Sequence, residues 1–340
     1  MKIKVLTPGL LTTVQDLGRP GWRSSGVPLS GAADTTSHRL ANFLVGNEAG
    51  AASLEIAGGR FSAQTEQAGW LAAGGKGGQF LIDKKEMDYG RLYFVPKGAM
   101  LEIRPGPESN YAYLAVPGGW DVPEVLGSKS TCLAAGFGGL DGRGLQKGDI
   151  LKSVDSPDEF GISDSAHSGK IWAGKWFVRD LPFRKLPSFE KFKSVIRVLP
   201  GPESHWWSEV YQEEFFKTPF IISARRDRMG VRFDIDQGAP TFQKLNTFGK
   251  LETMLSTAVG PGAIQMPPDG QPVALLADAQ TTGGYPRIAQ VIAVDIPRLA
   301  QIPSGQTVYF QKVTLEEAEQ LFFEHENMMR KIQLALRINK

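Results

Sequence analysis

Apolar and polar residues alternate in short runs along much of the chain. Such alternation is typical of β-strands with one buried face, and it is clear in LEIR at 101–104 and in VYFQKV at 308–313. The strands predicted in this way lie at 2–6, 91–95, 99–104, 111–116, 194–199, 219–223, 272–277, 289–294 and 306–313. The pattern therefore predicts a mainly β protein with few helices.

Two segments have helical periodicity instead. Asp34 is suited to capping a helix over 34–45. A second helix is predicted to begin at Thr314, where TLEE forms a capping box with Glu317 at the third helical position. Apolar residues then recur at helical spacing as far as Ile332. We expect this C-terminal helix to pack against the C-terminal half, and a partner-binding helix is the alternative.

A repeated sequence indicates an internal duplication. Residues 103–109 read IRPGPES and residues 198–204 read VLPGPES, so in each copy an apolar run leads into the same turn-forming residues. We therefore predict an N-terminal half at 1–188, which ends in a polar linker over 152–190, and a C-terminal half at 189–313. The C-terminal helix follows at 314–340.

Composition excludes several classes of protein. The chain has 340 residues, and its 38 basic and 36 acidic residues are interspersed, which argues against nucleic-acid binding. No apolar run approaches the ~18 residues that a membrane span needs. Pro8, Gly9 and Asp16 interrupt the N-terminal segment, so it lacks a signal-peptide core. The lone Cys132 fits a reducing compartment, and we expect a cytoplasmic protein.

Candidate chemistry is also limited by what the sequence lacks. The four histidines are scattered and no Cys or His pair has ligand spacing, so we predict no metal site. The glycine-rich GGKGG at 74–78 lacks the P-loop pattern, so we expect a flexible loop or turn there, and a mobile loop near a substrate is the alternative. The sequence shows no recognisable pair of a serine or cysteine with a histidine, so we predict no covalent nucleophile.

Four long segments resemble one protein family. They are TVQDLGRPGWRSSGVPLSGAADTTSHRLANFLVGN at 13–47, VPGGWDVPEVLGSKST at 116–131, RRDRMGVRF at 225–233 and ADAQTTGGYPRIAQVIAVD at 277–295. Together they resemble the family of the C subunit of 5-oxoprolinase, also described as biotin-dependent carboxyltransferase-like or allophanate hydrolase subunit 2-like. The antagonist of a sporulation kinase inhibitor belongs to the same family. The resemblance covers about residues 1–313.

The resemblance implies a fold, partners and a reaction. It implies two cyclophilin-like β-barrel halves, and it implies work beside proteins like the B and A subunits of 5-oxoprolinase. The implied reaction is the ATP-dependent opening of 5-oxo-L-proline to L-glutamate, with ATP used by the assembled enzyme and no covalently bound cofactor. One alternative is the carboxyltransferase half-unit of a biotin-dependent, urea-type amide carboxylase. Another is a non-enzymatic regulator that binds a kinase-inhibitor-like protein.

The chemistry of a cyclic amide indicates which residue types the site needs. An arginine suits the substrate carboxylate or a phosphorylated intermediate, because guanidinium binds planar anions through two parallel hydrogen bonds. The ring N–H needs an acceptor, since an unpaired buried donor costs about 1–3 kcal/mol. The segments at 225–233 and 277–295 supply such groups. The candidate catalytic residues are Asp227 and Arg287, and the candidate substrate-binding residues are Arg228, Gln280, Thr281, Thr282, Gly283, Gly284 and Tyr285.

The resemblance also bears on the substrate. In urea-handling relatives an asparagine occupies the position that matches Asp227, and the arginine that matches Arg287 is thought to line the same site. The aspartate here favours an oxoprolinase-type substrate. Structural alternatives remain: Asp227 can form an ion pair with neighbouring arginines, and Gly283–Gly284 can be only a turn. The segment at 13–47 can be a packed loop rather than a substrate contact, and GSKST at 127–131 can bind an anion or simply turn.

Overall fold

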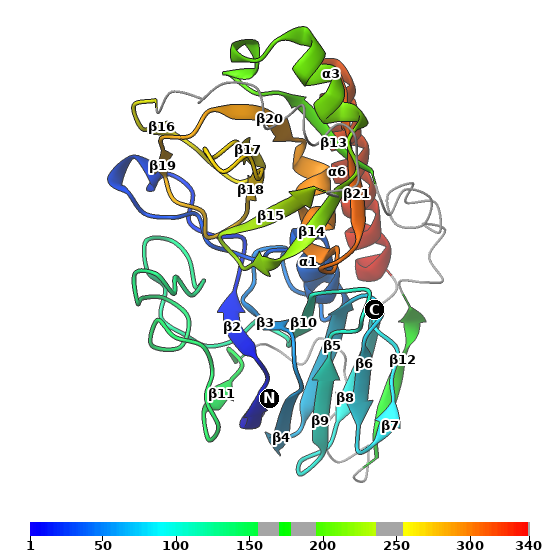
Figure 1. Ribbon diagram of the computed structural model, residues 1–340. Coiled ribbons are helices and arrows are strands. Elements are labelled where there is room, and N and C mark those ends of the chain that lie inside the picture. The colour runs from blue at the N-terminus through cyan, green and yellow to red at the C-terminus, as the bar shows by residue number, and fades with distance from the viewer. Residues whose placement is uncertain (156–169, 178–194, 236–253, 339–340) are drawn as a thin grey trace. The chain divides into compact units, whose positions relative to one another are not determined.

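The structure is a computed structural model that describes residues 1–155, 170–177, 195–235 and 254–338 (Figure 1). The chain divides into two compact units. The first unit comprises Met1–Arg19, Ser30–Leu186 and Asn327–Lys340, and the second comprises Pro20–Leu29 and Pro187–Glu326. The predicted boundary near residue 188 lies outside the described residues. In the described part of the chain, no helix is long and apolar enough to cross a membrane.

The first unit contains two six-stranded sheets. One has the order β11 (Ile150–Lys152), β1 (Lys2–Pro8), β4 (Phe61–Gln67), β9 (Met100–Arg104), β6 (Gln79–Ile82) and β7 (Lys85–Glu86). The other has the order β12 (Trp172–Phe177), β8 (Arg91–Val95), β5 (Gly69–Gly75), β10 (Tyr111–Ala115), β3 (Ser53–Ala57) and β2 (Leu11–Gln15). Strand β12 forms part of the segment predicted as a polar linker, so that prediction was wrong for residues 172–177.

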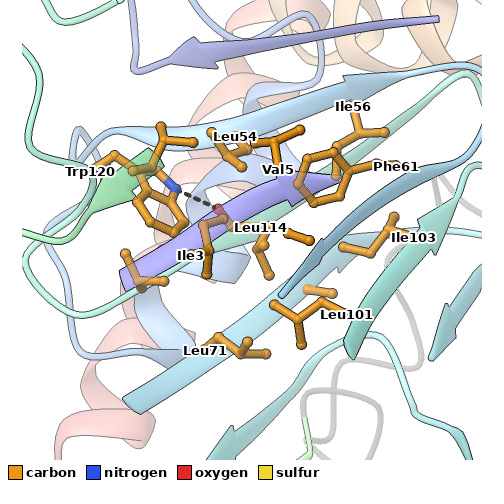
Figure 2. Packing of buried hydrophobic residues seen from close by; sticks show 14 of the residues in the cluster. Ile3, Val5, Leu54, Ile56, Phe61, Leu71, Leu101, Ile103, Leu114 and Trp120 are labelled. Carbon is orange, nitrogen blue, oxygen red and sulfur yellow. Dashed lines mark hydrogen bonds between the residues drawn. The ribbon is translucent and has the colours of Figure 1, made fainter. Parts of the chain in front are cut away.

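Apolar side chains from both sheets form one core. Ile3 and Phe61 come from the first sheet and Leu54 and Leu114 from the second, and all four are fully buried (Figure 2). Trp120 is also fully buried, and its indole N–H donates to the Leu114 carbonyl at 3.2 Å. Burying such side chains contributes about 1.5–3 kcal/mol each, so this shared core holds the two sheets of the first unit together.

Helix α1 (Thr35–Leu44) packs against β5 and β10 of the second sheet. The predicted cap is confirmed, because the Asp34 carboxylate accepts a hydrogen bond from the Ser37 N–H at 3.0 Å. The helix buries His38 completely. Its Nδ1 lies 2.8 Å from the Ser53 hydroxyl, and its Nε2 lies 3.3 Å from the Asn42 amide nitrogen. Burial lowers the pKa of His38 to about 4, although the Asp16 charge favours the cation.

The second unit is built on a closed seven-stranded barrel (Figure 1). Its order is β13 (Val195–Pro200), β20 (Arg287–Val291), β17 (Ala263–Gln265), β18 (Val273–Leu275), β15 (Gly230–Ile235), β14 (Phe220–Arg226) and β21 (Thr307–Lys312). Helix α3 (Glu209–Lys217) packs on β21 and places Phe215 against Phe310, with parallel rings whose centroids are 5.3 Å apart. The mainly β fold is therefore as predicted, with the closed barrel in the C-terminal half.

The strand predicted at 289–294 is displaced in the structure. Strand β20 covers 287–291 and a 3₁₀ turn, η5 (Ala293–Asp295), follows it and leads into helix α5 (Ile296–Gln301). Pro297 suits the first turn of that helix, since it lacks only an N–H that would have no partner there. The apolar run at 289–294 therefore enters a helix instead of continuing as a strand.

Helix α6 (Leu315–Ile338) begins where the capping box predicts. The Thr314 N–H donates to the Glu317 carboxylate at 2.8 Å, and the Glu317 N–H donates to the Thr314 hydroxyl at 3.2 Å. Its buried side chains are Met329, Ile332 and Leu336, all in the part that belongs to the first unit. The predicted packing against the C-terminal half was therefore wrong for this part. The exposed Phe322 and Phe323 leave the partner-binding alternative open.

The two PGPES copies form the same turn. The Ser109 N–H donates to the Gly106 carbonyl at 3.1 Å after β9, and the Ser204 N–H donates to the Gly201 carbonyl at 3.0 Å after β13. In both copies the glycine packs on the backbone of an adjacent segment: a Cβ on Gly106 would collide with the Gly77 carbonyl, and one on Gly201 with that of Arg287. The repeated sequence therefore forms the same local turn in both copies.

Candidate functional site

Asp227 lies in the tight turn between β14 and β15. Its carboxylate accepts hydrogen bonds from the Met229 N–H at 2.7 Å and the Gly230 N–H at 3.2 Å. The Asp227 N–H in turn donates to the Gly230 carbonyl at 3.1 Å. An aspartate that binds backbone N–H groups two and three residues ahead stabilises a turn by itself. The side chain is exposed, so the turn also presents the carboxylate to solvent.

Arg228 points the other way and is buried against Asp278. Its Nε donates to one carboxylate oxygen at 2.8 Å and its Nη2 to the other at 3.1 Å. The Asp278 N–H also donates to the Arg228 carbonyl at 3.0 Å. The pair therefore joins the segments at 225–233 and 277–295, which the sequence singled out separately. Because both side chains of this contact are buried, Arg228 holds the two segments together.

Arg287, at the start of β20, is paired with Glu203 of the second PGPES copy. Its Nε and Nη2 donate to the two Glu203 oxygens at 2.8 and 2.6 Å, and its backbone N–H donates to the same carboxylate at 3.0 Å. The Nη1 group donates to the Ala258 carbonyl at 2.7 Å. The hydrogen bonds from Arg287 lower the pKa of Glu203, and Glu203 raises the pKa of Arg287. Sequence reasoning missed Glu203 as a site residue, although the repeat contained it.

The pairing leaves part of the Arg287 guanidinium available. An arginine side chain carries five N–H donors, and the three contacts above use one each on Nε, Nη1 and Nη2. One donor therefore remains on Nη1 and one on Nη2. The side chain is 16% exposed. Glu203 and Ala258 thus hold the guanidinium in place, and two of its N–H groups have no partner among the described residues.

The residues before Arg287 gather around Gln265 of β17. The Gln280 amide donates to the Gln265 side-chain oxygen, and the Gln265 amide donates to the Tyr285 carbonyl, both at 3.4 Å. A Cβ on Gly283 would lie 2.5 Å from the Gln265 amide nitrogen, so any larger residue there would displace the Gln265 side chain. Gly283 also lies in the short strand β19 (Thr282–Gly283), and whether the glycine pair contacts a substrate stays a prediction. Gln265 is buried and carries no sequence signal that would have identified it.

A short strand pair completes this region. Strand β19 (Thr282–Gly283) pairs with β16 (Thr257–Ala258), and the Val259 N–H donates to the Thr281 carbonyl at 3.0 Å. The Met254 N–H donates to the Gly284 carbonyl at 3.4 Å. The segment from Gln280 to Arg287 is thus held against 254–259, and Arg287 binds the same stretch through Ala258.

Strand register places Asp227 and Arg287 beside different ends of β18. Gln265 lies opposite Arg287 on one side and opposite Val273, the first residue of β18, on the other. Gly230, which follows the Asp227 turn, lies opposite Leu275, the last residue of β18. Each side chain binds other groups of the protein. Joint binding of one substrate by both residues stays a prediction.

In the first unit, the beginning of the segment at 13–47 forms a dense polar cluster, whereas residues 20–29 of that segment belong to the second unit. The Asp16 carboxylate accepts hydrogen bonds from the Gly18 N–H at 2.7 Å, the Lys129 N–H at 2.6 Å and the Ser128 and Ser130 hydroxyls. A carboxylate of the protein thus binds the GSKST segment. This favours the structural reading of GSKST and of the residues around Asp16, and it does not bear on residues 20–29.

Arg19 belongs to the same cluster of the first unit. It is completely buried, lies 4.9 Å above the Phe137 ring and donates to the Ser130 carbonyl. Across the residues that the structure places, no group of three or more His, Cys, Asp or Glu side chains is arranged to hold a metal ion.

Comparison with known proteins shows the family. Residues 25–312 match the carboxyltransferase domain, subdomain A and B. The chain belongs to this family. It is 39% identical to the C subunit of 5-oxoprolinase from Escherichia coli, over 93% of each chain, and 35% identical to its counterpart from Haemophilus influenzae, over 94% of each chain. The family resemblance drawn from the four segments is confirmed.

A solved structure gives the same result for the fold. The urea amidolyase of K. lactis superposes with a TM-score of 0.82 at 27% identity, and the match covers 97% of this chain. The chain spans only 20% of that protein, so it corresponds to one region of a much longer polypeptide. The likeness supports the carboxyltransferase fold and keeps the urea-type alternative in view.

Proposed function

We propose that this chain is the C subunit of an ATP-dependent 5-oxoprolinase, which opens 5-oxo-L-proline to L-glutamate together with partners like the A and B subunits of that enzyme. The observation that carries the proposal is the 39% identity to the C subunit of a 5-oxoprolinase over 93% of both chains. The match to the K. lactis urea amidolyase is weaker in sequence and covers a fifth of that protein. ATP serves the assembled enzyme, and biotin enters only in the urea-type alternative.

We further propose that the substrate binds in the second unit, beside the segment from Gln280 to Arg287. The two remaining N–H donors of Arg287 suit an oxyanion, and the fixed position of its guanidinium reduces the entropy lost on binding. Gln280 is partly exposed and offers an amide oxygen that could accept the lactam N–H. The hydroxyls of Thr281 and Thr282 and the exposed Tyr285 ring border the same stretch of chain.

The roles proposed for the third segment differ from each other. Asp227 would accept a hydrogen bond from the substrate, because its carboxylate is exposed at a rigid turn. Arg228 would act by holding the 277–295 segment in place, since Asp278 already occupies its guanidinium. The absence of an asparagine at the Asp227 position supports an oxoprolinase-type substrate over urea.

Co-expression with the two partner subunits tests the proposal. The purified complex should release glutamate from 5-oxoproline only when ATP is present. Arg287→Lys keeps the positive charge but loses the planar guanidinium with its parallel N–H donors. Turnover should therefore fall tenfold or more, and each tenfold loss corresponds to about 1.4 kcal/mol of activation free energy. A complex that assembles and instead consumes ATP with urea and bicarbonate would support the carboxylase alternative. Binding of a kinase-inhibitor-like protein without turnover would support the regulator.

A further inference from the structure

One arginine of the second unit, Arg23, forms no ion pair with any residue that the structure describes. Within the described residues, both terminal nitrogens of Arg23 are buried and have no hydrogen-bond partner. Burial lowers the pKa of Arg23. A buried cation without a partner is unfavourable, so such a position is retained at a cost in free energy unless an anion or water reaches it.

The backbone around Arg23 is fixed by local hydrogen bonds. Arg23–Ser25 form a single 3₁₀ turn, η1, in which the Gly26 N–H donates to the Arg23 carbonyl at 3.0 Å. The Ser25 and Val27 N–H groups both donate to the Trp22 carbonyl. Gly26 has a φ of 79°, a left-handed conformation that glycine adopts without strain. The turn therefore holds the Arg23 backbone in a defined place within the second unit.

The guanidinium of Arg23 rests on Gly260. A Cβ at Gly260 would lie 3.3 Å from Nη2, 3.5 Å from Cζ and 3.6 Å from Nη1, so the absence of a side chain there lets the guanidinium approach. Gly260 is only two residues beyond Ala258, whose carbonyl accepts from Arg287. The segment 258–260 is thus bordered by two arginines that come from distant parts of the sequence.

The two arginines differ in charge balance. Glu203 neutralises Arg287 through two parallel hydrogen bonds, whereas no carboxylate of the described residues pairs with Arg23. Arg228, the other arginine predicted for the site, is neutralised by Asp278. An arriving oxyanion therefore gains more from Arg23 than from either partner-bound arginine. Arg23 as a residue is partly exposed, although both of its terminal nitrogens are buried.

We infer that Arg23 is the charged anchor of an oxyanion-binding site along the 258–260 segment, with Arg287 contributing directional hydrogen bonds from its remaining donors. The ligand group is a carboxylate or a phosphate. Under the proposed function, which this inference extends, it is the carboxylate of 5-oxoproline or a phosphoryl group derived from ATP. The anion-binding site itself does not depend on which of these reactions the assembled enzyme performs.

The test uses thermal unfolding of the full chain in chloride, acetate or inorganic phosphate at matched ionic strength, with Arg23→Gln as the variant. Arg225→Gln is the matched control, because that side chain is 62% exposed and lies 3.6 Å from Asp234. We expect acetate or phosphate to raise the midpoint of the native chain and of the control, and to leave Arg23→Gln unchanged. A native chain that neither anion stabilises beyond chloride would overturn the inference.

Two further measurements separate binding from a structural role. In chloride, Arg23→Gln should unfold at the native midpoint or above it, since removing an unbalanced buried charge does not destabilise the fold; a clear drop would show that Arg23 is structural. In titrations, 5-oxoproline should bind Arg23→Gln at least tenfold more weakly, while 2-pyrrolidone, the same lactam without the carboxylate, should bind both proteins equally. Loss of phosphate binding alone would assign the site to phosphate. Anion binding that depends on Arg23, in a complex without 5-oxoprolinase activity, would leave the site standing and refute only the proposed reaction.

Discussion

Glu203→Gln is the substitution that best probes the candidate site, because one carboxylate receives three N–H groups of Arg287. Glutamine keeps the shape and one acceptor oxygen, but it removes the charge and turns an amide N–H toward the guanidinium. Hydrogen bonds to charged groups contribute about 1.5–3 kcal/mol each, and breaking a fully buried pair costs about 3–5 kcal/mol. Here the side chains are 16% and 11% exposed. We therefore expect a loss of about 2–3 kcal/mol.

The loss should appear as a lower unfolding midpoint. For a protein of this size about 1 kcal/mol corresponds to roughly 2–4 °C, so the midpoint should fall by about 4–12 °C at pH 7. The chain supplies its own control in Glu108, which occupies the same place in the first PGPES copy but is exposed. Glu108→Gln should change stability by no more than about 0.5 kcal/mol. Equal losses in the two variants would refute the reasoning.

The pH dependence gives a second check on the same pair. Arg287 lowers the pKa of Glu203 below its ordinary value of 4.5, so the carboxylate stabilises the fold fully above about pH 4.5. That contribution is lost as the pH falls through the lowered pKa. The difference in stability between the native chain and Glu203→Gln should therefore be constant near neutral pH and shrink in acid. A difference that grows in acid would contradict the assigned ion pair.

Three other predictions concern separate parts of the molecule. Because His38 is buried neutral with a pKa of about 4, stability should decline as the pH falls from about 6.5 to 4, by up to about 3 kcal/mol, and His38→Gln should abolish this slope in urea titrations. Asp278→Asn leaves Arg228 buried without its counter-charge and should cost about 3–5 kcal/mol in denaturant unfolding. Asp227→Asn keeps the side-chain oxygen that accepts the hydrogen bonds of the turn, so the variant should unfold like the native chain. The assembled enzyme should nevertheless lose most of its 5-oxoproline turnover, and full turnover would show that Asp227 is not part of the site.

Local features were predictable because they depend on residues close in sequence. The caps at Asp34 and Thr314 form with the expected N–H partners, since a cap needs only the next three residues. The PGPES turn forms twice for the same reason. Strand β5 shows the limit of this reasoning. Its sequence GWLAAGG is buried along its centre on both faces, so it has no apolar–polar alternation to detect.

The candidate site was less predictable because its decisive contacts join distant residues. Arg287 and Glu203 are 84 positions apart, and Arg228 and Asp278 are 50 apart. Sequence alone presents Arg228 and Arg287 as equivalent candidates for binding an anion. The folded barrel makes the difference: the Arg228 guanidinium is buried against the Asp278 carboxylate, whereas Arg287 keeps two N–H donors. No sequence pattern identified Gln265 as a site residue. It lies in a strand of only three residues, which is too short to show a recognisable pattern.

Counter-charge therefore separates three arginines that the motifs do not distinguish. Arg228 is buried and its charge is neutralised by Asp278, so an anion would gain nothing from binding there. The role of Arg228 is to hold two segments together. Arg287 is neutralised but partly exposed, so it can direct an anion without supplying net attraction. Arg23 alone, among the three, has buried donors with no acceptor in the described part of the chain. Attraction by Arg23 and orientation by Arg287 act on the same 258–260 segment, and an oxyanion bound there would satisfy both. Under the proposed function, the carboxylate of 5-oxoproline would pair with the Arg23 charge, whereas a neutral amide such as urea would leave that charge without a counter-ion.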